Sequence, residues 1–255
     1  MKKLLLLTAT IICLGLAPAF AQFGMGGGGQ GPRFDGAMDK LFGDTRAFAA
    51  VLEVQTDAGK GDSVTMPGKF NFDAGKSRFE VNLSEVKGSA IPPDAAQQLK
   101  AMGMDMTIFI SRPDLKLSYM VYPGLNSYAE LVSQDTSASI NPDDYKIETS
   151  ELGKETVDGH ECVKNKATVT DKDGNKHEFT IWNATDLKKF PVKIITDEQG
   201  RSSTMLFKNV SLIKPAASLF EAPSGLTKYD NVQTMMQTEM MKKMGGGMGA
   251  PPVQH

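Results

Sequence analysis

Cysteine is scarce in this 255-residue chain, where it occurs only as Cys13 and Cys162. We expect Cys13 to be removed with an N-terminal leader, so a single thiol is left and an intramolecular disulfide is excluded. Histidine occurs three times, and the sequence has no Cys/His cluster with the spacing of a metal site. We therefore expect no cofactor and no metal, and a fold that depends on a hydrophobic core for its stability.

Long apolar runs are also rare, and the clearest one is Leu4–Leu16. It is shorter than the roughly 20 residues that cross a bilayer, it follows two lysines, and Ala19 and Ala21 come after it. This order is typical of a secretory signal peptide, so we expect residues 1–21 to be cleaved off after Ala21. The isoleucines before Cys13 do not suit a lipid-modified cysteine. The sequence thus predicts a protein of the periplasm or the extracellular space that does not span a membrane.

The charge balance of the exported chain is acidic. The signal peptide holds two of the 28 basic residues and none of the 30 acidic ones, which leaves a net charge of about −4. A negative chain argues against nucleic acid and against an anionic membrane surface as the main partner.

Glycine is dense near both ends of the chain, and this divides it into parts. We expect residues 22–38 to be a disordered Gly-rich segment, because dense glycine loses too much backbone entropy to become ordered without many contacts. Residues 39–230 contain no linker-like break and are expected to form one domain. Residues 231–255 are rich in methionine and glycine, and we expect a helix over Asp230–Met244 followed by a disordered tail.

Within the expected domain, apolar and polar residues alternate with a period of two, which predicts β-strands. Phe48, Leu52 and Val54 share one phase, for example, and short Gly-containing turns separate successive strands. About ten strands follow one another without the regular strand–helix alternation of a parallel α/β fold. One helix is predicted over Pro92–Met102. The predicted fold class is mainly β, an antiparallel sheet with one or two covering helices.

Three segments carry a resemblance to a known family. They are Ile110–Tyr122 with its Ser-Arg-Pro-Asp motif, Trp182–Lys193 with Phe-Pro-Val-Lys, and Phe207–Leu226 with Leu-Phe-Glu-Ala-Pro. Through them the chain resembles the periplasmic lipoprotein-carrier (LolA-like) superfamily, especially its uncharacterised relatives. The resemblance implies an antiparallel half-barrel, an open, curled sheet whose concave face is covered by helices and can take acyl chains. At the early hairpin the chain has Asp73–Lys76 where better-known carriers have Arg-Pro, so no carrier role passes to nearby Arg78.

The resemblance and the apolar strands together suggest a non-enzymatic protein that binds a lipid, a lipoprotein acyl chain or another apolar ligand. Such a site would bury methylene groups, each worth about 0.8 kcal/mol. The alternative is a structural or interaction module of the cell envelope, with a filled core, no ligand and another envelope protein as its partner. The candidate ligand-binding residues are apolar side chains of the strands and of the predicted helix: Phe48, Leu52, Phe70, Phe72, Phe79, Leu99, Met102 and Trp182.

Catalysis and metal binding have less support in the sequence. His160 and Cys162 lie two residues apart on a predicted strand and could act as base and nucleophile, but no Gly-rich oxyanion turn accompanies them. A packed thiol is the alternative that we favour, and no catalytic residue is assigned. The methionines of the C-terminal segment could bind Cu(I). A ridge of Met236, Met240 and Met244 on one helix face could instead pack against apolar surface, and packing is again favoured.

Overall fold

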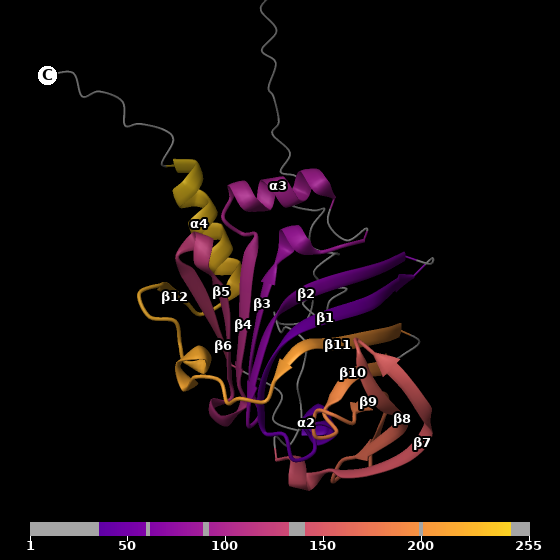
Figure 1. Ribbon diagram of the computed structural model, residues 1–255. Coiled ribbons are helices and arrows are strands. Elements are labelled where there is room, and N and C mark those ends of the chain that lie inside the picture. Colours follow the sequence, from indigo (N-terminus) through magenta and orange to yellow (C-terminus); the bar gives the residue numbers. More distant parts are fainter. Residues whose placement is uncertain (1–35, 60–61, 89–91, 133–140, 199–200, 246–255) are drawn as a thin grey trace, which may run out of the picture.

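The computed structural model describes five stretches of the chain, residues 36–59, 62–88, 92–132, 141–198 and 201–245 (Figure 1). The predicted signal peptide, most of the Gly-rich segment and residues 246–255 lie outside the described stretches.

The described residues form twelve strands in a single open sheet that curls on itself (Figure 1). The mainly β fold class and the open, curled sheet predicted from the sequence are confirmed, with more strands than the ten expected. Across the sheet the order is β12-β6-β5-β4-β3-β2-β1-β11-β10-β9-β8-β7. Along the chain the strands are β1 (Ala47–Gly59), β2 (Asp62–Asp73), β3 (Lys76–Asn82), β4 (Met106–Arg112), β5 (Leu117–Tyr122), β6 (Ser127–Val132), β7 (Lys146–Val157), β8 (His160–Thr170), β9 (Lys176–Ala184), β10 (Pro191–Glu198), β11 (Arg201–Ser211) and β12 (Thr227–Tyr229).

The sheet is built from two meanders. Each strand from β1 to β6 pairs with the next strand of the chain, and the same holds from β7 to β11. An antiparallel pairing of β1 with β11, in which Leu52 lies opposite Phe207, joins the two meanders. The short β12 adds in parallel to β6. One edge of the sheet is therefore β12, and the other is β7.

The β2–β3 hairpin shows how local sequence sets this arrangement. Asp73 lies opposite Lys76, and the two residues between them, Ala74 and Gly75, have φ angles of 50° and 84°. Two successive positive φ angles give the tight turn whose twist matches that of paired strands. Glycine adopts such angles freely, so the Asp-Ala-Gly-Lys sequence places the turn where the alternation predicted it.

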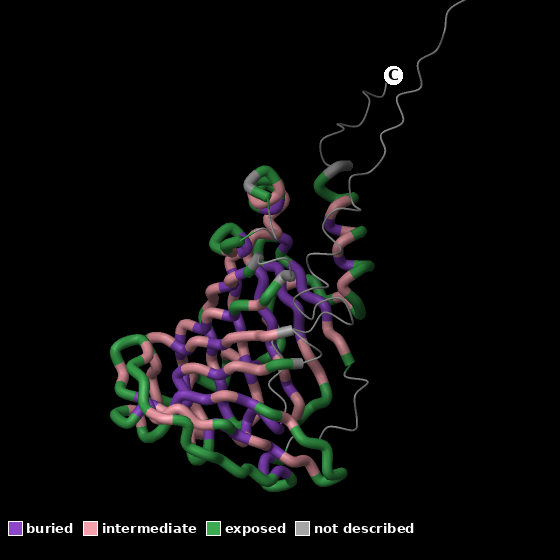
Figure 2. The backbone as a smooth tube through the Cα atoms, turned by 90° about the vertical axis from the view of Figure 1, so that its right-hand side faces the viewer, coloured by how far each residue is buried: buried purple, intermediate pink, exposed green. Residues whose placement is uncertain are grey.

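One face of the curled sheet carries most of the hydrophobic core. Side chains of a strand alternate between its two faces, and residues directly opposite each other share a face. Phe48 lies opposite Phe72, and Phe70 lies opposite Phe79, so all four side chains point to the same side. We call this side the inner face and the other the outer face. Figure 2 shows the resulting alternation of buried and more exposed residues along the strands.

Three α-helices lie among the described residues: α2 (Gly36–Leu41), α3 (Pro93–Ala101) and α4 (Val232–Gly245). The helix predicted over Pro92–Met102 is found as α3. By contrast, α2 was not predicted, and the border expected between residues 38 and 39 falls inside it. None of the described helices is both long and apolar enough to span a bilayer. Short 3-10 turns complete the fold: η3 (Leu83–Glu85), η4 (Pro113–Leu115), η5 (Pro123–Leu125), η6 (Pro142–Asp144) and η7 (Ala217–Phe220).

The helix α4 starts slightly later than the one predicted over Asp230–Met244. The side chain of Asn231 accepts a hydrogen bond from the backbone N–H of Thr234 at 2.7 Å. This is the contact by which an asparagine caps the first turn of a helix. Asn231, and not Asp230, therefore starts the helix.

Residues 212–226, which we call the strap, connect β11 to β12 across the outer face. Phe220 of the strap is fully buried, in a second apolar cluster with Ile110, Tyr119 and Tyr128 of the outer face. This cluster is separate from the inner core. The outer face of β4–β6 is thus covered by a segment that comes from the far end of the chain.

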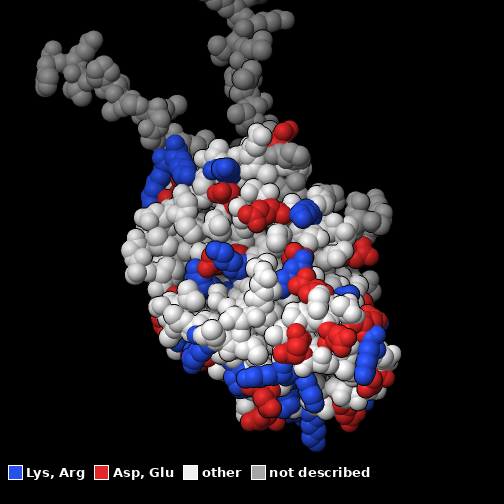
Figure 3. Space-filling model, in the orientation of Figure 1, with Lys and Arg blue, Asp and Glu red and all other residues white. Residues whose placement is uncertain are grey.

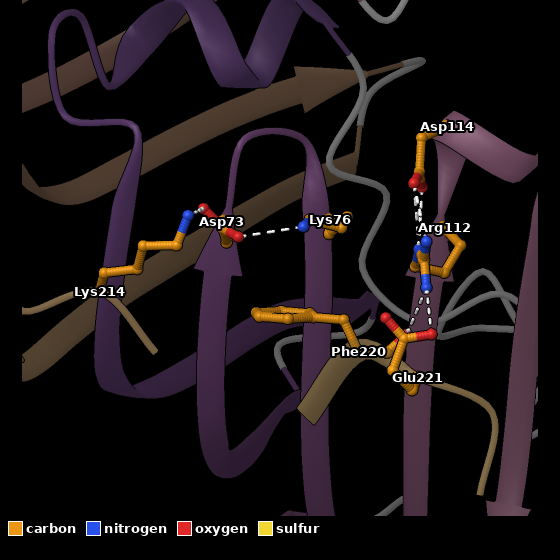
Figure 4. Close-up of polar contacts among 7 residues, drawn as sticks. All are labelled: Asp73, Lys76, Arg112, Asp114, Lys214, Phe220 and Glu221. Carbon is orange, nitrogen blue, oxygen red and sulfur yellow. Dashed lines mark hydrogen bonds and ion pairs between the residues drawn. The ribbon is translucent and has the colours of Figure 1, made fainter. Parts of the chain in front are cut away.

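Polar side chains fix the strap in place (Figure 4). Arg112 donates to the backbone carbonyl of Phe220 at 3.2 Å and to Glu221 Oε2 at 3.0 Å, while its Nη2 donates to Asp114 at 2.8 Å. Hydrogen bonding to Arg112 holds the pKa of Asp114 below its ordinary value. Arg78, the residue next to the early hairpin, donates to the carbonyl of Leu219 at 3.3 Å. Both arginines therefore attach the strap to the outer face of the sheet by donating to its backbone carbonyls.

A second group of contacts holds the start of the strap. Asp73 pairs with Lys76 at 3.0 Å and with Lys214 at 3.1 Å, and the Lys76 ammonium lies 5.5 Å from the centre of the Phe220 ring. Figure 4 shows Asp73 and Lys76 of the β2–β3 hairpin beside Lys214 and Phe220 of the strap. An ammonium at that distance over an aromatic ring is attracted by the ring electrons.

Candidate functional site

Phenylalanine rings close the inner face around α2. Phe42, just after α2, stacks on Phe190 with ring centroids 5.6 Å apart and lies 4.9 Å from Phe48. Phe48 is 4.7 Å from Phe190 and 5.8 Å from Phe207. Phe48, Phe190 and Phe207 are 0% exposed. Since a side chain that lines an open cavity keeps exposed surface, this end of the inner face is packed core.

Five of the candidate ligand-binding residues lie together in or beside this core. They come from β1–β3, share the inner face and are at most 2% exposed: Phe48, Leu52, Phe70, Phe72 and Phe79. Leu99 belongs to α3 and is 1% exposed, whereas Met102, just after α3, is only partly buried. Among these seven residues, Met102 has the most surface left for a ligand.

Trp182, the eighth candidate, lies on the outer face of β9. It pairs with Lys164 of β8 and Lys193 of β10, and their ammonium groups are 5.0 Å and 4.4 Å from the ring centre. Its indole N–H donates to Glu155 Oε2 at 2.8 Å. Trp182 is 3% exposed and belongs to the same core cluster as the five strand residues and Leu99, although polar side chains border its own side of β9. Two lysine stems and a carboxylate cover it.

The helix α3 is attached to the end of the sheet by few contacts. Leu99 is its one fully buried side chain among those described, and α3 packs mainly on η3. Val86, Met102 and Met104 beside it are half-buried apolar residues that touch the inner core. This end of the inner face is therefore less tightly covered than the phenylalanine-packed end.

The helix α4 covers the inner face at β6. Met235 is fully buried and Glu239 is 6% exposed, so these two residues mark the packed side of the helix. The expected ridge of Met236, Met240 and Met244 is thus not its centre. Met236 contacts the core from one side, Met240 is half-buried, and the side chain of Met244 lies outside the described residues. The packed side is rotated from the expected one because a polar group, Glu239, has partners in the sheet.

Glu239 is a buried carboxylate on the packed side of α4. Its Oε1 accepts hydrogen bonds from the Tyr229 hydroxyl at 2.6 Å, the Lys242 ammonium at 2.8 Å and the Ser127 hydroxyl at 3.0 Å. The contacts with Lys242 and Tyr229 hold the pKa of Glu239 below its ordinary value. The carboxylate is therefore charged at neutral pH. Nothing in the spacing of these four residues along the chain could have revealed the cluster.

Asp39 of α2 is a second buried carboxylate that the sequence did not reveal. It is 2% exposed, and neither carboxylate oxygen has a hydrogen-bond partner among the described residues. Among the described residues, Arg46 forms an ion pair with it, with Nη1 3.8 Å from Asp39 Oδ2. Burial raises the pKa of Asp39.

Burial also raises the pKa of Tyr122, on the inner face of β5, to about 12, so this phenol is neutral.

His160 and Cys162, the residues with most potential for chemistry, do not form a nucleophile–base pair. His160 Nδ1 is 2.8 Å from Asp186 Oδ2, while the Cys162 thiol donates to the backbone carbonyl of His160 at 3.4 Å. Burial raises the pKa of Cys162, which keeps the thiol protonated and unreactive. Within the five described stretches, no group of three His, Cys, Asp or Glu residues is placed to hold a metal ion.

This placement predicts the behaviour of the thiol. Replacing both His160 and Cys162 by alanine should leave a folded protein with a stability loss of about 1–2 kcal/mol, as for the removal of small packed groups. In the native protein, Cys162 should react with a thiol reagent only as fast as the protein unfolds. Stopped-flow labelling with and without denaturant measures both rates. Fast labelling of the native thiol would contradict the buried, protonated state.

Comparisons with known proteins match this chain to solved structures of low sequence identity. No family model and no curated protein matches the chain. A solved LolA superfamily protein from Nitrosomonas europaea matches with 11% identity and a TM-score of 0.38, over 73% of this chain and 94% of that one. The lipoprotein LppX of Mycobacterium tuberculosis matches with 13% identity and a TM-score of 0.34, over 71% and 93%.

A third solved structure is a putative outer membrane lipoprotein-sorting protein domain from Vibrio parahaemolyticus. It matches with 11% identity and a TM-score of 0.32, over 73% of this chain and 94% of that one. The solved structures that this chain is similar to thus include a protein described as a LolA superfamily protein.

Proposed function

We propose that this protein binds an apolar chain, such as a lipid acyl chain, in the bacterial periplasm without changing it chemically. The chain would enter at the end of the inner face that α3 and α4 cover. The observation that carries the proposal is the loose attachment of α3, with Leu99 fully buried and Val86, Met102 and Met104 only half-buried beside it. A helix held by so few buried contacts can open locally.

The energetic terms are compatible with this role. Exposing Leu99 when α3 opens would cost about 1.5–3 kcal/mol, and each buried methylene of a ligand would return about 0.8 kcal/mol. Roughly four methylenes therefore offset the opening, and a long acyl chain has many more. Methionine side chains such as Met102 and Met104 adapt to ligands of varied shape because they are unbranched and polarisable.

A second candidate function is a structural or interaction module of the envelope with a filled core. The observation that favours it is the burial of seven of the eight candidate residues to 3% exposure or less. In that case the inner face would serve stability alone, and the surface of the protein would contact another envelope protein.

Titration with an apolar fluorescent probe, N-phenyl-1-naphthylamine, separates the two candidates. Wild-type protein should bind the probe saturably, one molecule per chain. The double variant Leu99→Gln and Met102→Gln should bind about tenfold more weakly, since tenfold corresponds to the loss of about 1.4 kcal/mol of apolar contact. Native mass spectrometry of protein purified from the periplasm should detect co-purifying lipid.

The matched control is the double variant Leu115→Gln and Ile213→Gln. These side chains are 50% and 78% exposed and lie away from α3, so their removal takes away apolar surface without touching the proposed entrance. This control should bind the probe like the wild type. If no saturable binding is found, or if the Leu99 and Met102 variant stays folded and binds equally well, the filled-core module is the better account.

A further inference from the structure

The last described part of the chain surrounds one edge of the sheet. The strap crosses the outer face, β12 adds to the edge strand β6, and α4 then packs against the inner face (Figure 1). Phe220 is buried on one side of the sheet and Met235 on the other, both at 0% exposure. Residues 212–245 therefore hold the first meander from both faces.

Glu239 joins the elements of this edge. Its Oε1 receives hydrogen bonds from Tyr229 of β12, from Ser127 of β6 and from Lys242 of its own helix. A buried carboxylate that lost these donors would either stay charged without partners or take up a proton, and both outcomes cost free energy. The docking of α4 on the sheet therefore depends on this one residue more than on any other polar group of the helix.

The far end of α4 reaches α3. Lys243 donates from Nζ to the backbone carbonyl of Met102 at 2.5 Å. Met102 follows the last turn of α3, where carbonyl groups have no partner within the helix and where a cation is favoured. The last turn of α4 carries Lys242 and Lys243, and basic side chains gather at this end of the helix in Figure 3.

The segment that follows α3 leaves little freedom at this junction. Gly103 has a φ angle of 70°, and a Cβ added to it would lie 2.5 Å from the carbonyl oxygen of Gly124. Glycine is thus required for the backbone of the α3–β4 connection to pass against η5. We expect α3 to open by rotating about Gly103. The Met102 carbonyl lies next to this point and accepts the hydrogen bond from Lys243.

We propose that α4 is a latch for α3. Glu239 fixes α4 to the sheet, and Lys243 at the end of α4 holds α3 closed over the inner face. Release of α4 frees α3, because Leu99 is then the main remaining anchor. That α3 covers a ligand site rests on the proposed function, but the coupling between α4 and α3 can be measured without a ligand.

Hydrogen–deuterium exchange of the ligand-free protein tests the latch. Lys243→Gln should raise exchange in residues 95–103 about two- to fivefold, the range of a cation contact at a helix end, and leave α4 unchanged. Glu239→Ala should raise exchange in α4 about tenfold or more, because three donors lose their acceptor, and should raise exchange in α3 as well. Gln237→Ala, an exposed change on the same helix, is the control and should alter neither helix.

Unchanged exchange in α3 when Glu239→Ala has freed α4 would overturn the latch, and so would unchanged exchange in α3 for Lys243→Gln. If Glu239→Ala does not fold, the exposed Lys243 variant alone decides the matter. Probe binding is measured separately on the same variants. A coupled α3 and α4 in a protein that binds no probe would support the latch and contradict the proposed function, and the reverse result would contradict the latch alone.

Discussion

Replacing Phe48 by alanine is expected to lower the free energy of unfolding by about 3–5 kcal/mol, the usual cost of emptying a buried aromatic site. Phe48 is fully buried, and the centroids of five other phenylalanine rings lie within 6 Å of its own: Phe42, Phe70, Phe72, Phe190 and Phe207. These rings come from the segment just after α2, from both meanders and from the turn before β10. A cavity here therefore weakens the contact that holds the meanders together.

Denaturant unfolding followed by circular dichroism measures this loss. Phe48→Leu keeps much of the buried volume and should cost roughly half as much, because volume-conserving apolar changes are tolerated best. Leu115→Ala is the surface control, since Leu115 is 50% exposed, and should change stability by less than about 0.5 kcal/mol. A loss of less than about 1 kcal/mol for Phe48→Ala would mean that the rings do not form a tightly packed core.

Replacing Arg112 by alanine is expected to detach the strap and to cost about 2–3 kcal/mol. This is below the 3–5 kcal/mol for breaking a fully buried ion pair, because Asp114 and Glu221 keep contact with water. The Arg112 side chain is 10% exposed, whereas those of Asp114 and Glu221 are 47% and 62% exposed. Loss of the guanidinium also leaves the carbonyl of Phe220 without this donor.

Arg112→Lys separates charge from geometry. A lysine keeps the charge but cannot donate in a fork to Asp114 and at the same time to Glu221 and Phe220, so it should restore less than half of the lost stability. Exchange measurements on residues 212–226 report directly on the strap. Arg78→Ala, which removes a single contact to Leu219, should loosen the strap less. Equal effects of the Arg112 and Arg78 variants would show that the fork has no special role.

The parts of the fold that follow from local sequence could be predicted. The alternation at Phe48, Leu52 and Val54 indicates burial on one face of a strand. Most strands pair with the next strand of the chain, so short turns and local alternation together predict the meanders. The helix α3 follows from its prolines and its following glycine. In contrast, α2 has six residues and β12 has three, too few to show a period. Both depend on contacts with distant parts of the chain.

The faces of Trp182 and α4 could not be predicted for a different reason. Between β9 and β10 the register shifts, with Pro191 opposite Asn183 and Lys193 opposite Trp182. The extra residue lies on β10, so it changes which β10 side chains lie beside Trp182, and alternation within β9 cannot reveal this. On α4, hydrophobicity alone favours a methionine ridge. The buried side is instead set by Glu239 and its partners on β6 and β12.

The joining of the two meanders through β1 and β11 has a consequence for how the chain folds. Within each meander the contacts are local, so each can begin to form as soon as its own hairpins are present. The pairing of Leu52 with Phe207 spans most of the chain, and contacts of such long range form slowly. Until β11 is present, β1 has a free edge and Phe48 lacks its contacts with Phe190 and Phe207. A chain that is exported from its N-terminus would therefore cross the membrane with its first half unable to complete a core, and truncation before residue 207 should yield an aggregation-prone protein with an unpaired strand at its centre.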